Sequence, residues 1–297
     1  MFPAIEPSET QKLIVNQMSS SMVYILIPVV LLVITYILLY LYAGPFFKGL
    51  PVLVYHKISS TKKPDFLTVA TSRMREHLEY ITKKGYNTIF LSDMIEYIEK
   101  GTPLPPKPLM ITLDDGFRDN YTDLYPLLKE FNCKANIFIV AGFVQTPDNL
   151  GPRAEGEFML VEEAKELCSE RVQYGLHTMY HQSYHHMTLD EIDEDMRQSK
   201  QRLDDLRIPY TPCFAYPFAA YMKDDPVKQK AMFGILKKHG VRYAFKVGDR
   251  LNKMPMNKMN RLLLNRLHMN GAYSMFKFKM DLIGFIRIVQ RFERILK

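Results

Sequence analysis

Short apolar runs and amphipathic stretches alternate along most of the chain. Apolar runs typical of buried strands cover residues 50–58, 86–91, 109–113, 135–140, 174–177, 213–218 and 242–247. Apolar residues at helical spacing predict helices over residues 72–85, 92–101, 161–171, 188–206 and 226–238, with a further helix opening at Pro126. Ser92 is expected to cap the helix over 92–101, and Thr188 with Glu191 has the sequence of a capping box. This alternation favours a parallel sheet with crossover helices.

Six or seven such strand–helix units in roughly 220 residues favour a closed α/β barrel over an open sheet. In α/β folds, the side chains that carry chemistry gather at the carboxyl ends of the strands. The stretch "LMITLDDGF" places two adjacent carboxylates, Asp114 and Asp115, at such an end. Burying an ionised carboxylate is costly unless it is paired or bound to a metal. The pair is therefore a candidate functional site.

Two histidines follow another predicted strand, in "YGLHTMYHQSYHH". His177 and His181 are four residues apart, so they can point the same way and share a metal, although such pairs also arise by chance on helices. With one carboxylate they form a three-ligand set that leaves positions open for water and substrate. One aspartate suffices as a ligand, which leaves the other free to act as a base. His185 and His186 are expected to be solvated.

An uncharged apolar segment of 22 residues, 22–43, follows an N-terminal tail over residues 1–21. As a helix it would reach about 33 Å, enough to cross the hydrocarbon core of a bilayer. The tail carries Lys12 against Glu6 and Glu9, unlike the basic leader of a secretory signal. The sequence therefore predicts one N-terminal transmembrane helix that acts as an uncleaved anchor.

The charged residues beside this segment indicate on which side of the membrane the large domain lies. Four lysines follow the segment closely: Lys48, Lys57, Lys62 and Lys63. The positive-inside rule then places the large domain in the cytoplasm. Three cysteines without paired spacing predict no disulfide framework, which agrees weakly with that side.

The chain carries a formal net charge of +7, but its basic residues are scattered and form no nucleic-acid motif. No nucleic-acid partner is expected. Basic residues concentrate in 273–297, where apolar residues recur near helical spacing: Phe278, Leu282, Phe285, Val289, Phe292 and Leu296. Two interpretations of this basic amphipathic helix stay open, a segment lying on the membrane surface and a helix packed on the domain.

The motifs "TLDDGF", "HTMYH" and "FAYPF" resemble the successive motifs of the polysaccharide deacetylases, the NodB-homology group of carbohydrate esterase family 4. The similarity covers about residues 50–270. The "FAYP" form and the "VYH" strand most resemble bacterial poly-N-acetylglucosamine deacetylases. The resemblance implies a deacetylase domain over residues 44–272 with a distorted (β/α) barrel of the NodB-homology type.

The same resemblance implies roles for the two clusters. Asp115, His177 and His181 correspond to the ligands of one divalent metal ion, usually zinc. Asp114 corresponds to the base that activates water. These roles agree with the chemistry that the residue types allow at the strand ends.

The resemblance implies two further roles, and for each of them the sequence offers two candidate residues. The acid that protonates the leaving amine corresponds to His56 of the "VYH" strand, with His268 in "RLHMN" as the competing candidate. An arginine that orients the base corresponds to Arg266, with Arg261 as the fallback.

The resemblance also implies that the third motif contributes Tyr216, Pro217 and Phe218 to the substrate and oxyanion site. The backbone N–H of Phe218 corresponds to a donor for the oxyanion. Ala219 stands where the family usually has glycine, which costs little unless the backbone angles require glycine. The chain has no Trp to wall a sugar pocket. Four aromatic residues could replace it: Tyr184, Tyr216, Phe218 and Tyr221.

The expected activity is removal of N-acetyl groups from amino sugars of a polysaccharide or cell-surface glycan. The resemblance implies a domain outside the cytoplasm, against the charge beside the anchor, with the membrane and polysaccharide synthesis or export proteins as partners. A deacetylase of a lipid-linked sugar at the cytoplasmic face, an esterase for O-acetyl groups and a non-catalytic glycan-binding protein are the alternatives.

Overall fold

The computed structural model describes residues 24, 26–36, 49–146, 157–168, 171–256 and 261–285. The chain divides into two units, Met1–Phe47 and Lys48–Lys297. In the first unit, residues 26–36 are helical and exposed. The predicted anchor over 22–43 lies partly outside the described residues. Within the described part, no helix combines the length and apolar character that crossing a membrane requires.

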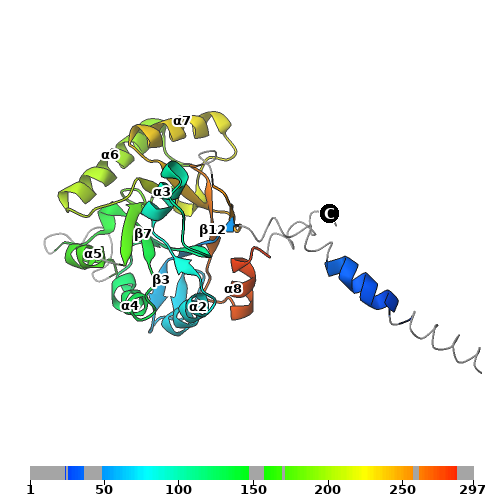
Figure 1. Ribbon diagram of the computed structural model, residues 1–297. Coiled ribbons are helices and arrows are strands. Elements are labelled where there is room, and N and C mark those ends of the chain that lie inside the picture. Colours follow the sequence, from blue (N-terminus) through cyan, green and yellow to red (C-terminus); the bar gives the residue numbers. More distant parts are fainter. Residues whose placement is uncertain are drawn as a thin grey trace, which may run out of the picture. The chain divides into compact units, whose positions relative to one another are not determined.

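Seven parallel strands of the second unit close into a barrel, as the alternating pattern predicts (Figure 1). In spatial order they are β2 (Val52–Tyr55), β12 (Leu264–His268), β10 (Tyr243–Val247), β9 (Cys213–Ala215), β8 (Val172–Leu176), β7 (Ala135–Ile139) and β6 (Pro108–Asp115). Pairing of β6 with β2 closes the ring. A short strand, β5 (Asn87–Thr88), pairs with the first residues of β6.

Helices surround the strands in Figure 1. They are α2 (Thr71–Lys83), α3 (Leu91–Lys100), α4 (Tyr125–Glu130), α5 (Val161–Leu167), α6 (Leu189–Asp205), α7 (Pro226–Lys238) and α8 (Met275–Leu282). Shorter elements are β1 (Gly49–Leu50), β3 (Lys57–Ser59), β4 (Thr68–Ala70), β11 (Asn252–Lys253), the π-helical turn η1 (Asn120–Leu124), and the 3₁₀ turns η2 (Ala141–Phe143) and η3 (Pro217–Ala219).

Alternate residues of the strands face two different apolar layers. Outward residues such as Leu53, Ile111 and Ile137 pack in one cluster with the helices. Inward residues such as Met110 and Phe138 form a second cluster inside the barrel. Because side chains alternate along a strand, the face of each residue near a strand end follows from its neighbours.

One predicted cap is confirmed and the other is wrong. Thr188 and Glu191 form the capping box, with the Thr188 N–H donating to the Glu191 carboxylate at 2.6 Å. Helix α3 begins at Leu91 instead of after Ser92, with Phe90 as the N-cap residue. The Asp93 carboxylate accepts the Phe90 N–H at 2.8 Å, so it takes over the capping of this end of the helix.

Two strand predictions need correction, and one strand, β12, was not predicted. The run over 50–58 is divided at His56, between β2 and β3. The run over 86–91 contributes only the two residues of β5. The sequence of β12 shows no continuous apolar run, because two of its buried, inward-facing positions are occupied by polar residues, Arg266 and His268.

The C-terminal helix is described only in part. Helix α8 packs on α2 through Phe278, whose ring stacks on His77 with 3.8 Å between ring centroids. Phe278 and Leu282 are buried, so the packed interpretation describes α8. The helix ends where Gly284 adopts a φ of 76°. Residues 286–297 of the predicted segment lie outside the described residues.

Candidate active site

Asp114 and Asp115 are the last two residues of β6, at the carboxyl end of the barrel. Both side chains are buried. Asp114 points inward, in register with Met110 and Thr112, and lies 3.9 Å from His177 between Oδ2 and Nε2. Asp115 adopts a φ of 76°, which turns the chain out of the strand. Two buried carboxylates therefore meet at one strand end, as the sequence predicts.

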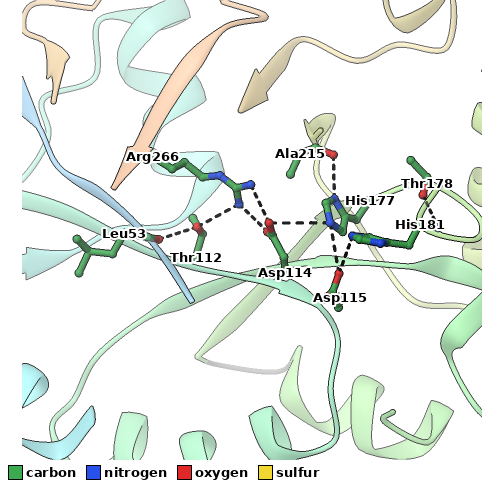
Figure 2. Close-up of polar contacts among 9 residues, drawn as sticks. All are labelled: Leu53, Thr112, Asp114, Asp115, His177, Thr178, His181, Ala215 and Arg266. Atoms are coloured by element: carbon green, nitrogen blue, oxygen red, sulfur yellow. Dashed lines mark hydrogen bonds and ion pairs between the residues drawn. The ribbon is translucent and has the colours of Figure 1, made fainter. Parts of the chain in front are cut away.

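Arg266 pairs with Asp114 in a two-pronged contact, and their strands β12 and β6 both pair with β2 (Figure 2). Its Nη1 and Nη2 donate to Oδ1 and Oδ2 of Asp114 at 2.5 and 2.8 Å. Burial alone would raise the pKa of Asp114, but the Arg266 guanidinium, together with His177 and His56, outweighs burial and holds that pKa below its usual value. Arg266, not the fallback Arg261, is the arginine that holds this carboxylate in its ionised form.

Asp115, His177 and His181 bring one ligand atom each to within 4.8 Å of one another. Oδ1 of Asp115 lies 3.4 Å from His177 Nε2 and 3.2 Å from His181 Nε2. That oxygen is buried and accepts no hydrogen bond in the described part of the chain. Two imidazoles and a carboxylate around an unsatisfied buried oxygen fit one divalent cation. The predicted three-ligand set therefore assembles in the fold.

Hydrogen bonding fixes the tautomer of the central histidine. The Nδ1–H of His177 donates to the Ala215 carbonyl at 2.8 Å, which leaves Nε2 with a lone pair toward Asp115. Burial lowers the pKa of His177, but the Asp114 and Asp115 charges outweigh it and raise that pKa overall. Burial and the neighbouring His177 lower the pKa of His181 to about 4, so His181 is neutral and can act as a ligand at neutral pH.

The loop after β8 carries both histidines in a constrained backbone. Thr178 and His181 adopt φ angles of 71° and 57°. Side chains other than glycine favour this region only weakly, and it costs about 1–3 kcal/mol at such sites. The loop is fastened to η2, where the Gly142 N–H donates to the Met179 carbonyl at 2.9 Å. A Cβ at Gly142 would lie 2.5 Å from that oxygen, so glycine is required for this contact.

Asp195 of α6 also holds this loop, a role that no sequence pattern predicts. Its Oδ1 accepts the Met179 N–H at 3.0 Å, and its Oδ2 accepts the Tyr184 hydroxyl at 2.9 Å. The side chain is buried, so both bonds are shielded from water. Asp195 therefore holds the loop at Met179, between the two candidate histidine ligands, and at Tyr184, just after the second of them.

We expect Asp195→Asn to weaken Zn²⁺ binding by about 10- to 100-fold, the usual range for groups that orient metal ligands. The new amide NH₂ cannot accept one of the two hydrogen bonds. Zn²⁺ affinity should be measured by competition with a chromophoric chelator. The matched control is Asp193→Asn on the same helix, which removes contacts to Lys238 and His239 at 2.7 Å. Equal affinities in both variants would show that Asp195 does not position the site.

The two candidate acids lie at adjacent strand ends. His56 directly follows β2, and His268 ends β12, which pairs with β2. Their ring centroids are 6.1 Å apart. Burial lowers the pKa of both. Nδ1 of His56 and Nε2 of His268 are buried and have no hydrogen-bond partner among the described residues, so both rings can serve a ligand.

The third motif begins in β9, and its last three residues, which follow the strand, divide between the site and the core. Phe218 is 71% exposed, and its ring centroid lies 4.5 Å from that of His181. Pro217 is buried beside it. Ala219 has a φ of 53°, so this position does use a backbone angle that favours glycine, at a cost of about 1 kcal/mol. Tyr216 faces the core, where its hydroxyl donates to the Leu262 carbonyl at 2.9 Å.

The predicted aromatic wall is only partly available to a ligand. The side chains of Tyr184 and Tyr216 are buried, so they cannot form a platform for a sugar. Tyr221 is partly buried and packs on the core. Phe218 is exposed, and a second exposed aromatic, Phe66, lies against His268 although the sequence did not suggest it.

Similarity to known proteins agrees with this geometry. The family model described as polysaccharide deacetylase matches residues 101–244. A Bacillus subtilis (strain 168) protein whose name assigns it to the polysaccharide deacetylases is 27% identical over 175 residues, 59% of this chain and 58% of that protein. The poly-beta-1,6-N-acetyl-D-glucosamine N-deacetylase of Escherichia coli (strain K12) is 30% identical over 100 residues, 33% of this chain and 15% of that protein. The chain thus matches less than two thirds of either relative.

Similarity in structure extends to the barrel as a whole. The deacetylase PplD of Streptococcus pyogenes, solved with acetate, superposes with a TM-score of 0.66 at 18% identity, covering 79% of this chain and 98% of that one. At this identity the match concerns the fold. The match of the family model across three of the site's strand ends, β6, β8 and β9, identifies residues 101–244 as a polysaccharide deacetylase domain.

Proposed function

We propose that this chain is a metal-dependent hydrolase that removes N-acetyl groups from the amino sugars of a polysaccharide. One observation carries the proposal. Three candidate metal ligands and a separately held, ionised Asp114 meet at a single end of the barrel, with 3.9 Å between Asp114 and His177. Hydrolysis of an amide needs both a centre that activates water and a base beside it.

Asp115, His177 and His181 would hold the metal, with zinc the expected ion. When bound there, such an ion acidifies water and polarises the acetyl carbonyl. Asp114 would take the proton from the attacking water, because Arg266 keeps its carboxylate ionised and oriented. The division assigns different tasks to adjacent residues: Asp115 faces the histidines, and Asp114 faces the arginine.

The remaining groups would complete the hydrolysis. The backbone N–H of Phe218 would donate to the oxyanion as negative charge develops on the acetyl oxygen. His56 would give a proton to the sugar nitrogen as the carbon–nitrogen bond breaks, which releases acetate and a free amine. His268, at the adjacent strand end, is the competing acid.

The substrate class follows from the name of the Escherichia coli relative, a poly-beta-1,6-N-acetyl-D-glucosamine N-deacetylase. We propose a related N-acetylated glycan, with polysaccharide synthesis or export proteins as partners. Residues 22–43 would anchor the chain in the membrane, with the catalytic domain outside the cytoplasm. Reporter fusions at the C-terminus, each active on one side only, test that side. A cytoplasmic result would favour a lipid-linked sugar as the substrate.

Metal removal is the direct test of the reaction. We expect the purified full-length chain to hold about one metal ion per chain. It should release acetate from N-acetylglucosamine oligomers, lose this activity in a chelator and regain it with Zn²⁺. Metal analysis measures the number of ions per chain, and an enzymatic acetate assay measures the rate of acetate release. Full activity without metal would contradict the mechanism, and tight glycan binding without acetate release would favour a non-catalytic glycan-binding protein.

A further inference from the structure

Phe66 is an aromatic side chain held in solvent beside the candidate site. It is 63% exposed, and its ring lies over His268 with 4.3 Å between centroids and 32° between planes. A single exposed apolar residue is common on protein surfaces and implies no function by itself. Phe66 differs from such residues in two ways: its ring contacts His268 of the candidate site, and the turn that carries it is fixed by hydrogen bonds.

The turn that carries Phe66 is fixed by hydrogen bonds on both sides. Oδ1 of Asp65 accepts the backbone N–H groups of Leu67 and Thr68 at 2.9 and 2.7 Å. The Asp65 carbonyl accepts the Gly271 N–H at 2.9 Å, which joins the turn to the segment after β12. A Cβ at Gly271 would lie 2.0 Å from the Thr68 carbonyl oxygen, so the two segments are in close contact. Phe66 is therefore presented by a rigid support.

The surface next to Phe66 contains polar atoms that lack partners. Nε2 of His268 and Nδ1 of His56 are buried and have no hydrogen-bond partner in the described ranges. Buried ring nitrogens are normally satisfied, so an unpaired set at a strand end indicates a ligand with hydroxyl or amine groups. An exposed aromatic face beside unpaired polar atoms is suited to a sugar, which has an apolar ring face and polar substituents.

Phe66 and Phe218 lie over opposite sides of the barrel mouth. Phe66 contacts His268 of β12, whereas Phe218 follows β9 and contacts His181, which follows β8. In the closed strand order, β12 and β8 are separated by β10 and β9 on one side and by β2, β6 and β7 on the other. Asp114 links these two sides, since it pairs with Arg266 of β12 and lies 3.9 Å from His177, which follows β8. A glycan crossing the site would therefore meet both of them.

We propose that Phe66 is the platform for a sugar ring next to the one that loses its acetyl group. This inference rests on the proposed function, because it takes a glycan as the substrate. Phe66 would contact the substrate away from the reacting bond. It would therefore contribute to binding of substrate and transition state alike, and its loss would raise KM more than it lowers kcat.

Three variants test the platform. In Phe66→Ala we expect about a tenfold rise in KM and Kd for N-acetylglucosamine oligomers, with kcat within about twofold. Phe66→Tyr keeps the aromatic face and should behave as the wild type. The matched control is Phe276→Ala on α8, which removes an exposed phenylalanine of similar exposure, 70%. Oligomer binding should be measured by calorimetry on the metal-free full-length protein, which is not expected to turn the oligomers over, and turnover by acetate release with Zn²⁺.

A small acetate ester, 4-nitrophenyl acetate, distinguishes a platform for a neighbouring sugar from general damage to the active site by the substitution. It carries no neighbouring sugar, so Phe66→Ala should hydrolyse it at the wild-type rate. Equal losses on the ester and the oligomers would overturn the platform, as would unchanged oligomer affinity. Because affinity is measured without turnover, the result also holds if the wild type releases no acetate, which contradicts only the proposed reaction. A wild type that binds no oligomer would overturn the platform itself.

Discussion

Asp114→Asn is expected to lower kcat for acetate release by about 10²–10⁴-fold, the usual contribution of a general base. The amide is nearly the same shape as the carboxylate but cannot take a proton from water. Metal content should stay near one ion per chain, because the three candidate ligands are other residues. Steady-state kinetics and metal analysis on the same preparation give both numbers.

Asp115→Asn is the matched comparison for this experiment. The two residues are adjacent, equally buried and differ in their contacts, since Asp115 faces His177 and His181 while Asp114 faces Arg266. We expect Asp115→Asn to lose metal and activity together and to recover part of both at high Zn²⁺ concentration. Substantial turnover by Asp114→Asn at full metal occupancy would show that another group is the base.

The location of the site could be predicted from the sequence because its signals are local. Asp114 and Asp115 interrupt an apolar run, and His177 and His181 follow another. Parallel strands bring such ends to one edge of the barrel whatever the details of the loops. These residues are therefore found without knowing which strands are neighbours.

The alternation of a strand could also have corrected one prediction. Cys213 and Ala215 face the barrel interior, so Tyr216 faces the opposite layer with Phe214 and cannot reach the site with its side chain. The pattern of β12 was harder to interpret. Its inward positions carry a charge and a histidine, and the charge of Arg266 is compensated by Asp114, which is far away in the chain.

Residues that act across the fold left no local signal. Asp195 reaches Met179 only because α6 packs against the loop after β8. Phe66 lies over His268 only because Gly271 allows two distant segments to touch. A buried aspartate on a polar helix and a phenylalanine in a loop are both ordinary in a sequence. Their roles depend on three-dimensional contacts, which composition and periodicity do not encode.

Arg266→Met is expected to destabilise the fold by about 3–5 kcal/mol, the cost of removing one partner from a buried ion pair. Arg266 is fully buried, and its loss leaves the Asp114 charge in the barrel without the guanidinium that stabilises it. Methionine matches the length of the aliphatic stem, which limits the effect of lost packing. Unfolding in denaturant, followed by far-UV circular dichroism on metal-free protein, measures this change.

The double variant Arg266→Met with Asp114→Asn separates charge from packing. If the destabilisation comes from an unpaired buried carboxylate, removing that charge should restore a large part of the lost stability. The two single changes would then be strongly non-additive, because the guanidinium and the carboxylate are each other's partners at 2.5 and 2.8 Å. Additive losses would instead mean that Arg266 stabilises the barrel mainly by packing on Phe138, whose ring centroid lies 5.3 Å from its Cζ. In that case the role of Arg266 in keeping Asp114 ionised and oriented would have to be abandoned.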